Sequence, residues 1–167
     1  MQHRVFTLLT LSLALCLSPF TVGVAEESGD TVTKVRDLET LSEQASEHKL
    51  PILIMFSQDQ CPYCTIMEEN YLRPMLRSGQ YKDKIIIRKV KIDDYKTLTD
   101  FNGKRIDAEE LTSRYGSWVT PTLVFLNSEG KEIAPKLVGI GTEGFFAGDI
   151  DNAIEVALTH LRSVALK

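Results

Sequence analysis

Apolar and polar positions in this chain form short continuous runs and stripes at helical spacing. Ile52 to Phe56 is an unbroken apolar run, with Pro51 before it and polar residues after it. A run of this length and composition predicts a buried β-strand. Between Thr33 and His48, apolar residues recur at helical spacing, which predicts a helix ahead of the strand. A second helical stripe follows Cys64 and ends at Ser78–Gly79.

The rest of the chain continues this alternation of strands and helices. The predicted strands are Ile85–Ile92, Thr122–Leu126 and Glu132–Val138. The predicted helices are Ala108–Tyr115, which stops at Gly116, and a closing helix marked by Ile150, Ile154, Leu158 and Leu161. Tyr95 to Asp107 contains Asn102–Gly103 and is expected to form a loop or a small hairpin.

The order of these elements predicts an α/β fold. Alternating strands and helices at the start call for parallel strands with helices on both faces of a sheet. The turn Asn127–Gly130 joins the last two strands and calls for an antiparallel pair. The expected architecture is a mixed central sheet of four strands, or of five.

Residues 1–25 have the pattern of a secretory signal peptide. Arg4 supplies a positive charge, an apolar core runs from Leu8 to Leu17, and the small residues Gly23 and Ala25 suit a cleavage site. The core is too short for a membrane span, and an uncleaved anchor is the alternative. We therefore expect cleavage near Ala25 and export, to the periplasm or elsewhere outside the cytoplasmic membrane. We also expect a flexible N-terminus over residues 26–32 and one domain over residues 33–167.

Charge argues against a nucleic-acid-binding function. The whole chain has 19 Lys and Arg against 23 Asp and Glu, a net charge of −4, and loss of Arg4 with the signal peptide takes it to −5. This balance provides no basic face for nucleic acid or anionic lipid. We expect a monomer that does not bind nucleic acid.

Cysteine usage indicates redox chemistry. Of the three cysteines, Cys16 lies in the signal peptide, which leaves Cys61 and Cys64 in the mature chain. A structural zinc site needs about four ligands, so no metal is expected, and no further pair exists for a stapling disulfide. An exported chain with one Cys-x-x-Cys pair is expected to carry a redox-active dithiol.

Cys61 falls where the first predicted strand ends and a helix begins. Unpaired backbone N–H groups and the positive end of the helix dipole stabilise a thiolate at that position. A cysteine stabilised in this way is a nucleophile near neutral pH. Pro62 suits the first helical turn, because its missing N–H removes no helical hydrogen bond. The expected chemistry is thiol–disulfide exchange.

Three segments resemble the thioredoxin fold. They are Cys61-Pro62-Tyr63-Cys64 after the buried strand, Val119 to Phe125 containing Thr120-Pro121, and the hairpin Asn127 to Glu132. The resemblance covers residues 33–167 and implies a thioredoxin-like domain. More narrowly, the signal peptide, Met55-Phe56 and Glu68-Glu69-Asn70 are similar to those of exported thioredoxin-related proteins associated with bacterial sulfur-oxidation clusters.

The resemblance implies a role for each candidate site residue. Cys61 is expected to be the nucleophile, and the deeper Cys64 to resolve the mixed disulfide. Pro121 is expected to be cis, with the backbone of Thr120 presented beside Cys61 to an extended substrate. Tyr63 and Trp118 are candidates for a surface that binds protein partners, and aromatic packing at a loop edge is the alternative.

The chain also departs from classical thioredoxins around the cysteines. The family's buried acid, six residues before the first cysteine, is Met55 here, whereas Lys89 matches the family's lysine on the next strand. The family's Trp before the first cysteine is Gln60. Glu68, four residues after Cys64, is a candidate proton acceptor, and a solvated helical carboxylate is the alternative.

The leading hypothesis is an exported protein-disulfide oxidoreductase that acts on protein thiols and disulfides, as a reductant. It is expected to need no cofactor beyond the Cys61–Cys64 disulfide and to take electrons from a membrane thiol reductase. The alternatives are a glutaredoxin-like enzyme, an oxidising or isomerising disulfide enzyme, and a metallochaperone that binds Cu(I) through two thiolates. The direction stays open because Cys-Pro-Tyr-Cys is also the glutaredoxin pair, for which potentials are about −200 to −230 mV.

Overall fold

The computed structural model describes residues 31–165. The predicted signal peptide and most of the predicted flexible N-terminus lie outside the described residues. Val32, the last residue of the segment expected to be flexible, is only 2% exposed, so packing begins one residue before the expected boundary.

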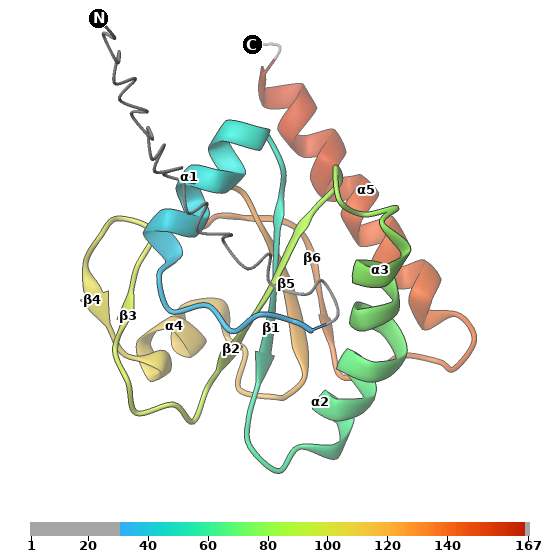
Figure 1. Cartoon of the computed structure of the whole chain (residues 1–167), viewed down its shortest axis with the longest axis horizontal. Helices are drawn as coiled ribbons and strands as arrows, with labels where there is room; N and C mark the ends of the chain where they lie inside the picture. Colours follow the sequence, from blue (N-terminus) through green and yellow to red (C-terminus); the bar gives the residue numbers. More distant parts are fainter. Residues whose placement is uncertain (1–30, 166–167) are drawn as a thin grey trace, which may run out of the picture.

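A mixed four-stranded sheet forms the centre of the domain, as predicted (Figure 1). Its strands are β1 (Ile52–Ser57), β2 (Ile86–Lys91), β5 (Thr122–Leu126) and β6 (Glu132–Val138). They are ordered β2-β1-β5-β6. β1 pairs parallel to β2 and antiparallel to β5, and β5 pairs antiparallel to β6. The central strand β1 is therefore paired along both edges.

Side chains of β1 alternate between two cores, because successive residues of a strand point to opposite faces. Leu53 and Met55 face the core that is covered by α2 (Pro62–Met67), α3 (Arg73–Ser78) and α5 (Phe146–Ala165). Ile54 and Phe56 face the core that is covered by α1 (Leu38–His48) and α4 (Ala108–Tyr115). Figure 1 shows these two groups of helices on either side of the sheet. Every residue of β1 is buried, which explains the unbroken apolar run.

The first helix is shorter than predicted. It was expected from Thr33, but α1 begins at Leu38. The residues before it pair with β2 instead: the Val35 N–H donates to the Lys89 carbonyl at 2.9 Å, and the Lys89 N–H donates to the Thr33 carbonyl at 3.0 Å. These bonds provide partners for backbone groups of β2, which is an edge strand of the sheet. Asp37 then caps the helix by accepting a hydrogen bond from the Thr40 N–H at 2.9 Å.

The segment expected to form a loop or small hairpin contains two short strands. β3 (Leu98–Thr99) and β4 (Arg105–Ile106) pair antiparallel, which confirms the hairpin. Gly103 lies in the turn between them with φ of 77°, a conformation that glycine adopts without steric cost.

The helix after Cys64 contains a wider turn that the periodicity did not reveal. Between α2 and α3, η1 (Glu68–Leu72) is a π-helical turn, in which the Arg73 N–H donates to the Glu68 carbonyl five residues earlier. Pro74 follows directly and has no N–H to donate to Asn70, so a regular α-helical ladder is interrupted here in any case. The helix ends at Ser78, as predicted, with Gly79 in a left-handed conformation.

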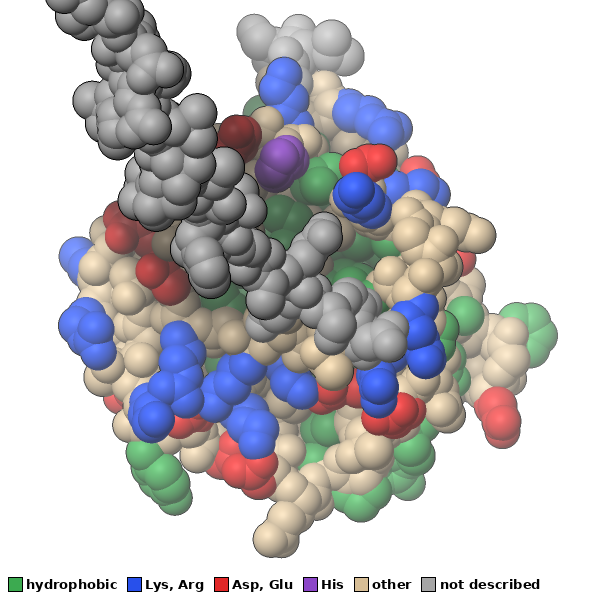
Figure 2. All heavy atoms as spheres, in the orientation of Figure 1, with side chains coloured by type: hydrophobic (Ala, Val, Ile, Leu, Met, Phe, Trp, Pro, Cys, Tyr) green, Lys and Arg blue, Asp and Glu red, His purple; other side chains and the backbone are tan. Residues whose placement is uncertain are grey.

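Charged side chains of both signs are interleaved on the face that Figure 2 shows. Asp94 is paired with both Lys34 and Arg36. Between residues 31 and 165, no helix has the length and apolar character needed to cross a membrane.

Candidate active site

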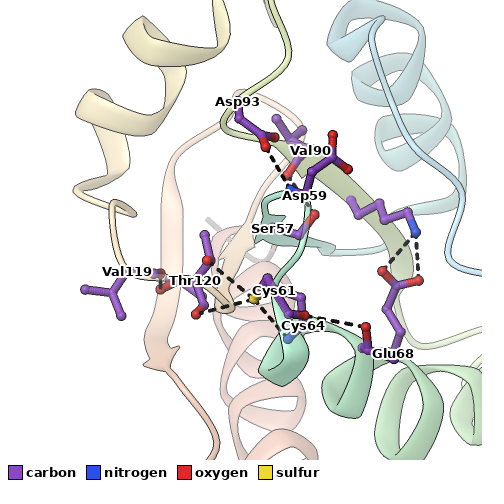
Figure 3. Close-up of a disulfide and its surroundings, with 12 residues drawn as sticks. Ser57, Asp59, Cys61, Cys64, Glu68, Val90, Asp93, Val119 and Thr120 are labelled. Carbon is purple, nitrogen blue, oxygen red and sulfur yellow. Dashed lines mark hydrogen bonds and ion pairs between the residues drawn. A yellow bond between two sulfur atoms is a disulfide. The ribbon is translucent and has the colours of Figure 1, made fainter.

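The two cysteines lie where β1 gives way to α2 (Figure 3). Cys61 is the N-cap of α2, and its Sγ accepts a hydrogen bond from the Cys64 N–H at 3.1 Å. Gln60 precedes it with φ of 53°, which turns the chain sharply between strand and helix. Cys61 and Cys64 form a disulfide with their Cα atoms 5.2 Å apart.

The two sulfurs differ in their exposure. Cys61 is partly exposed, whereas Cys64 is 4% exposed and belongs to the core that contains Met55 and Met67. A molecule approaching from solvent therefore meets Cys61 first. A backbone N–H at the helix N-terminus, directed at Cys61, stabilises negative charge on that sulfur once the disulfide is reduced.

A second loop places its backbone against Cys61. The Thr120–Pro121 peptide bond is cis, as predicted. The Thr120 hydroxyl donates to Cys61 Sγ at 3.6 Å, and the Thr120 carbonyl oxygen lies 3.8 Å from the same sulfur (Figure 3). Residues almost sixty positions apart in sequence thus meet at the exposed sulfur.

Exposed apolar side chains flank these two loops. Tyr63 is 64% exposed, Trp118 54% and Val119 60%. These side chains are largely exposed, so a binding partner can reach them. The sequence analysis named Val119 only as the start of the segment that resembles the thioredoxin cis-proline loop, and not as a binding residue.

A polar cavity of about 440 Å³ opens on the other side of the cysteines. Its charged lining residues are Asp59, Glu68, Lys89 and Lys91, and both cysteines also line it. Lys89 Nζ donates to both carboxylate oxygens of Glu68, at 2.8 and 2.7 Å (Figure 3). Lys91 forms an ion pair with one carboxylate oxygen of Asp59, and the Asp59 backbone N–H donates to Asp93 at 2.8 Å. Within the described residues, no group of three His, Cys, Asp or Glu side chains is arranged to hold a metal ion.

Sequence comparison identifies the family. Residues 38–148 match the sequence profile of the thioredoxin-like domain. The chain belongs to the thioredoxin-like domain family. No curated protein matches this thioredoxin-like chain in sequence.

Solved thioredoxins share the fold of this thioredoxin-like domain. Thioredoxin f from spinach chloroplast has a TM-score of 0.53 at 18% identity, over 77% of this chain and 94% of its own. Oxidised mitochondrial thioredoxin 3 from Saccharomyces cerevisiae has a TM-score of 0.50 at 17% identity, over 74% and 93% of the two chains. Thioredoxin from Schistosoma mansoni has a TM-score of 0.50 at 16% identity, over 77% and 97%. The predicted thioredoxin-like fold is therefore confirmed.

The thioredoxin-like domain brings most of the predicted site residues together. Cys61, Cys64, Thr120 and Pro121 meet at one place. Tyr63 lies in the first turn of α2, and Trp118 lies in the loop that leads to Thr120. The pairing of Glu68 with Lys89 was not predicted, although each residue was noted separately. The available signal was the placement of Glu68 one helical turn after Cys64 together with a lysine on the strand beside β1.

Proposed function

We propose that this protein is an exported thiol–disulfide oxidoreductase that reduces disulfides of protein clients. One observation carries the proposal: the disulfide-bonded pair at the start of α2 faces the cis Thr120–Pro121 loop through the exposed sulfur. This arrangement gives one accessible sulfur, one buried sulfur bonded to it, and the Thr120 carbonyl beside the accessible sulfur.

In the reduced protein, Cys61 attacks one sulfur of a client disulfide as a thiolate. The first client thiolate leaves and a mixed disulfide joins Cys61 to the client. Cys64 then attacks Cys61 Sγ, so the Cys61–Cys64 disulfide forms and the second client sulfur leaves. The client gains two electrons, and the dithiol loses two.

The client is held as an extended segment beside Thr120. Its backbone pairs with the Thr120 main chain, and its side chains contact the exposed side chains of Tyr63, in the first turn of α2, and of Trp118 and Val119, in the loop before Thr120. Aromatic side chains contribute large contact areas at little entropic cost, so these residues supply most of the binding energy.

Export and direction rest on the sequence. Residues 1–25 carry the signal-peptide pattern, and a reductant in an oxidising compartment has to be reduced again after each cycle. A thiol reductase in the membrane is the electron donor we propose. The association with sulfur-oxidation clusters stays a prediction.

Redox titration against glutathione, combined with an insulin-reduction assay, tests the proposal. We expect a potential of about −220 mV or lower and insulin reduction that Cys61→Ser abolishes. A potential above about −150 mV would identify an oxidant instead. If the Cys61→Ser protein still reduced insulin, Cys61 would not be the nucleophile.

A further inference from the structure

Resolution of the mixed disulfide requires a proton to leave a buried thiol. Cys64 is 4% exposed and lies in a core with Met55 and Met67, which carry no group that accepts a proton. Apolar surroundings disfavour the thiolate that the attack on Cys61 needs. The proton of Cys64 therefore has to pass to a group on the polar side of the cysteines, in the cavity of about 440 Å³ that Cys64 itself lines.

Two carboxylates line that cavity, and they differ in their surroundings. The Asp59 side chain is 68% exposed and pairs with Lys91. The Glu68 side chain is 20% exposed and follows Cys64 by one helical turn. Both of its oxygens are held by Lys89, which is itself only 22% exposed. Glu68 is thus the more enclosed and the more firmly positioned of the two.

The ion pair keeps a base available beside an apolar site. A partly buried carboxylate without a partner would tend to take up a proton and lose its use as an acceptor. The ammonium of Lys89 compensates the charge of Glu68 and fixes its direction. A carboxylate has further lone pairs for a water molecule or a thiol, even while it accepts from a lysine.

We propose that Glu68 accepts the proton that Cys64 releases, directly or through a water molecule in the cavity, and that Lys89 is the positioning residue. This role of Glu68 rests on the proposed function: it accounts for the proton that is released when Cys64 attacks Cys61 in the second step of exchange. As the proton passes from Cys64 Sγ to Glu68, the Cys64 sulfur forms a bond to Cys61 Sγ, and the bond from Cys61 to the client sulfur breaks. The client sulfur leaves with the electron pair as a thiolate. In the opposite direction, protonated Glu68 returns the proton to Cys64.

Stopped-flow mixing of the reduced protein with a chromogenic aromatic disulfide separates the two steps. The first coloured thiolate reports the attack by Cys61, and the second reports resolution by Cys64. The key variant combines Glu68→Gln with Lys89→Met, because Glu68→Gln alone leaves a cation near Cys64 that would itself favour the thiolate. Glu69→Gln is the matched control, since Glu69 is the adjacent carboxylate, is 51% exposed and pairs with Arg73 on its own helix.

At pH 7 we expect the second phase of the double variant to be on the order of 100-fold slower, which is the low end of what a positioned general base contributes. The first phase should stay within about twofold of wild type, and the deficit should shrink toward pH 9 as hydroxide replaces the carboxylate. A second phase equal to that of Glu69→Gln from pH 6 to 9 would overturn the assignment, and so would equal slowing of both phases at every pH. A wild-type protein that releases no coloured thiolate would instead overturn the proposed function itself.

Discussion

The guanidinium of Arg114 donates two hydrogen bonds to the carboxylate of Asp100, at 2.7 and 2.9 Å. The pair ties α4 to the β3–β4 hairpin, and the Asp100 side chain is 5% exposed. Burial raises the pKa of Asp100, but the hydrogen bonds from Arg114 and from the Phe101 N–H outweigh it and lower the pKa below its usual range. The ionised pair therefore stabilises the folded state.

Arg114→Ala should lower the free energy of unfolding by about 1–2 kcal/mol, because it leaves a buried carboxylate without its charged donor. We place the effect in this range because the Arg114 side chain is 36% exposed, so water screens part of the interaction. Urea denaturation at pH 7 measures it. Lys131→Ala is the control, since Lys131 and its partner Glu129 are both largely exposed and the midpoint should hardly move. Equal losses in the two variants would contradict the argument.

The same pair predicts a pH dependence. Because the pKa of Asp100 is lower in the folded than in the unfolded state, its contribution is complete above the unfolded value of about 3.9. That contribution is lost as the pH falls through the lower folded value. Between pH 6 and pH 3, wild type should lose more stability than Arg114→Ala. Parallel curves for the two proteins would show that Asp100 is not responsible.

Alanine substitutions at Gly130 and Gly79 distinguish the cost of a strained backbone conformation from the cost of steric overlap. Both have positive φ, 75° and 68°, but a Cβ on Gly130 would lie 2.6 Å from Phe101 Cδ2, whereas nothing lies within 4 Å at Gly79. Gly79→Ala should cost about 1 kcal/mol for the left-handed conformation alone. Gly130→Ala should cost a further 1–3 kcal/mol or so for overpacking. Denaturant midpoints of the two variants decide this, and similar values would mean that Phe101 moves aside at little cost.

Much of the fold could be predicted because the buried strands are nearly continuous apolar runs bounded by turns. The predicted start of α1 was wrong because the spacing of Val35 from the apolar residues of the helix is itself helical. Only its backbone pairing with Lys89 shows that Val35 belongs to an extended segment. The π-helical turn was missed because the α-helical segments on either side of it, α2 and α3, have only six residues each, and apolar stripes this short do not locate a one-residue insertion.

The site was predictable only where its residues are close in sequence or match a family pattern. Cys61 and Cys64 are three positions apart, and the cis Thr120–Pro121 bond was predicted from the resemblance to thioredoxins. The ion pair of Glu68 with Lys89 spans 21 positions between a helix and a strand. Its formation depends on how η1 and β2 are packed, which no local pattern specifies.

Cys64→Ser should trap client proteins on Cys61. With the resolving sulfur removed, the mixed disulfide has no internal nucleophile to break it. Non-reducing electrophoresis after incubation with exported proteins should show adducts that reducing agent releases. Adducts should be absent from the protein in which Cys61→Ser is added to Cys64→Ser. Alkylation of the Cys64→Ser protein mainly at a site other than Cys61 would contradict the assignment of the nucleophile.

Trp118→Ala should weaken the binding of protein clients without changing the chemistry. An exposed aromatic residue at the centre of a binding surface is worth about 1–2 kcal/mol, so KM for insulin should rise about tenfold. The rate with a small aromatic disulfide should stay the same, because that substrate does not reach Trp118. Val164→Ala, near the C-terminal end of α5, removes exposed apolar surface far from the cysteines and serves as the control (Figure 1). An equal loss with both substrates would place Trp118 in the chemistry or in folding.

Expression of the full chain in a bacterium should yield a mature protein that begins at about Glu26. The prediction follows from the small residues Gly23 and Ala25 after the apolar core. Intact-mass measurement of the protein from the periplasmic fraction checks it. Replacing Ala25 by a bulky residue should block cleavage, and a wild-type mass that retains Met1 to Ala25 would indicate a membrane-anchored enzyme.

The π-helical turn Glu68–Leu72 has a consequence for how this chain is aligned with its relatives. A helix that is α-helical throughout turns about 100° with each residue, and the wider turn accommodates one residue more. A gap-free alignment with such a helix would therefore rotate everything after Leu72 out of phase and would match Met75, a core residue, to a solvent position. The correct alignment needs a one-residue insertion inside a helix, between Cys64 and Pro74, where alignments normally allow none.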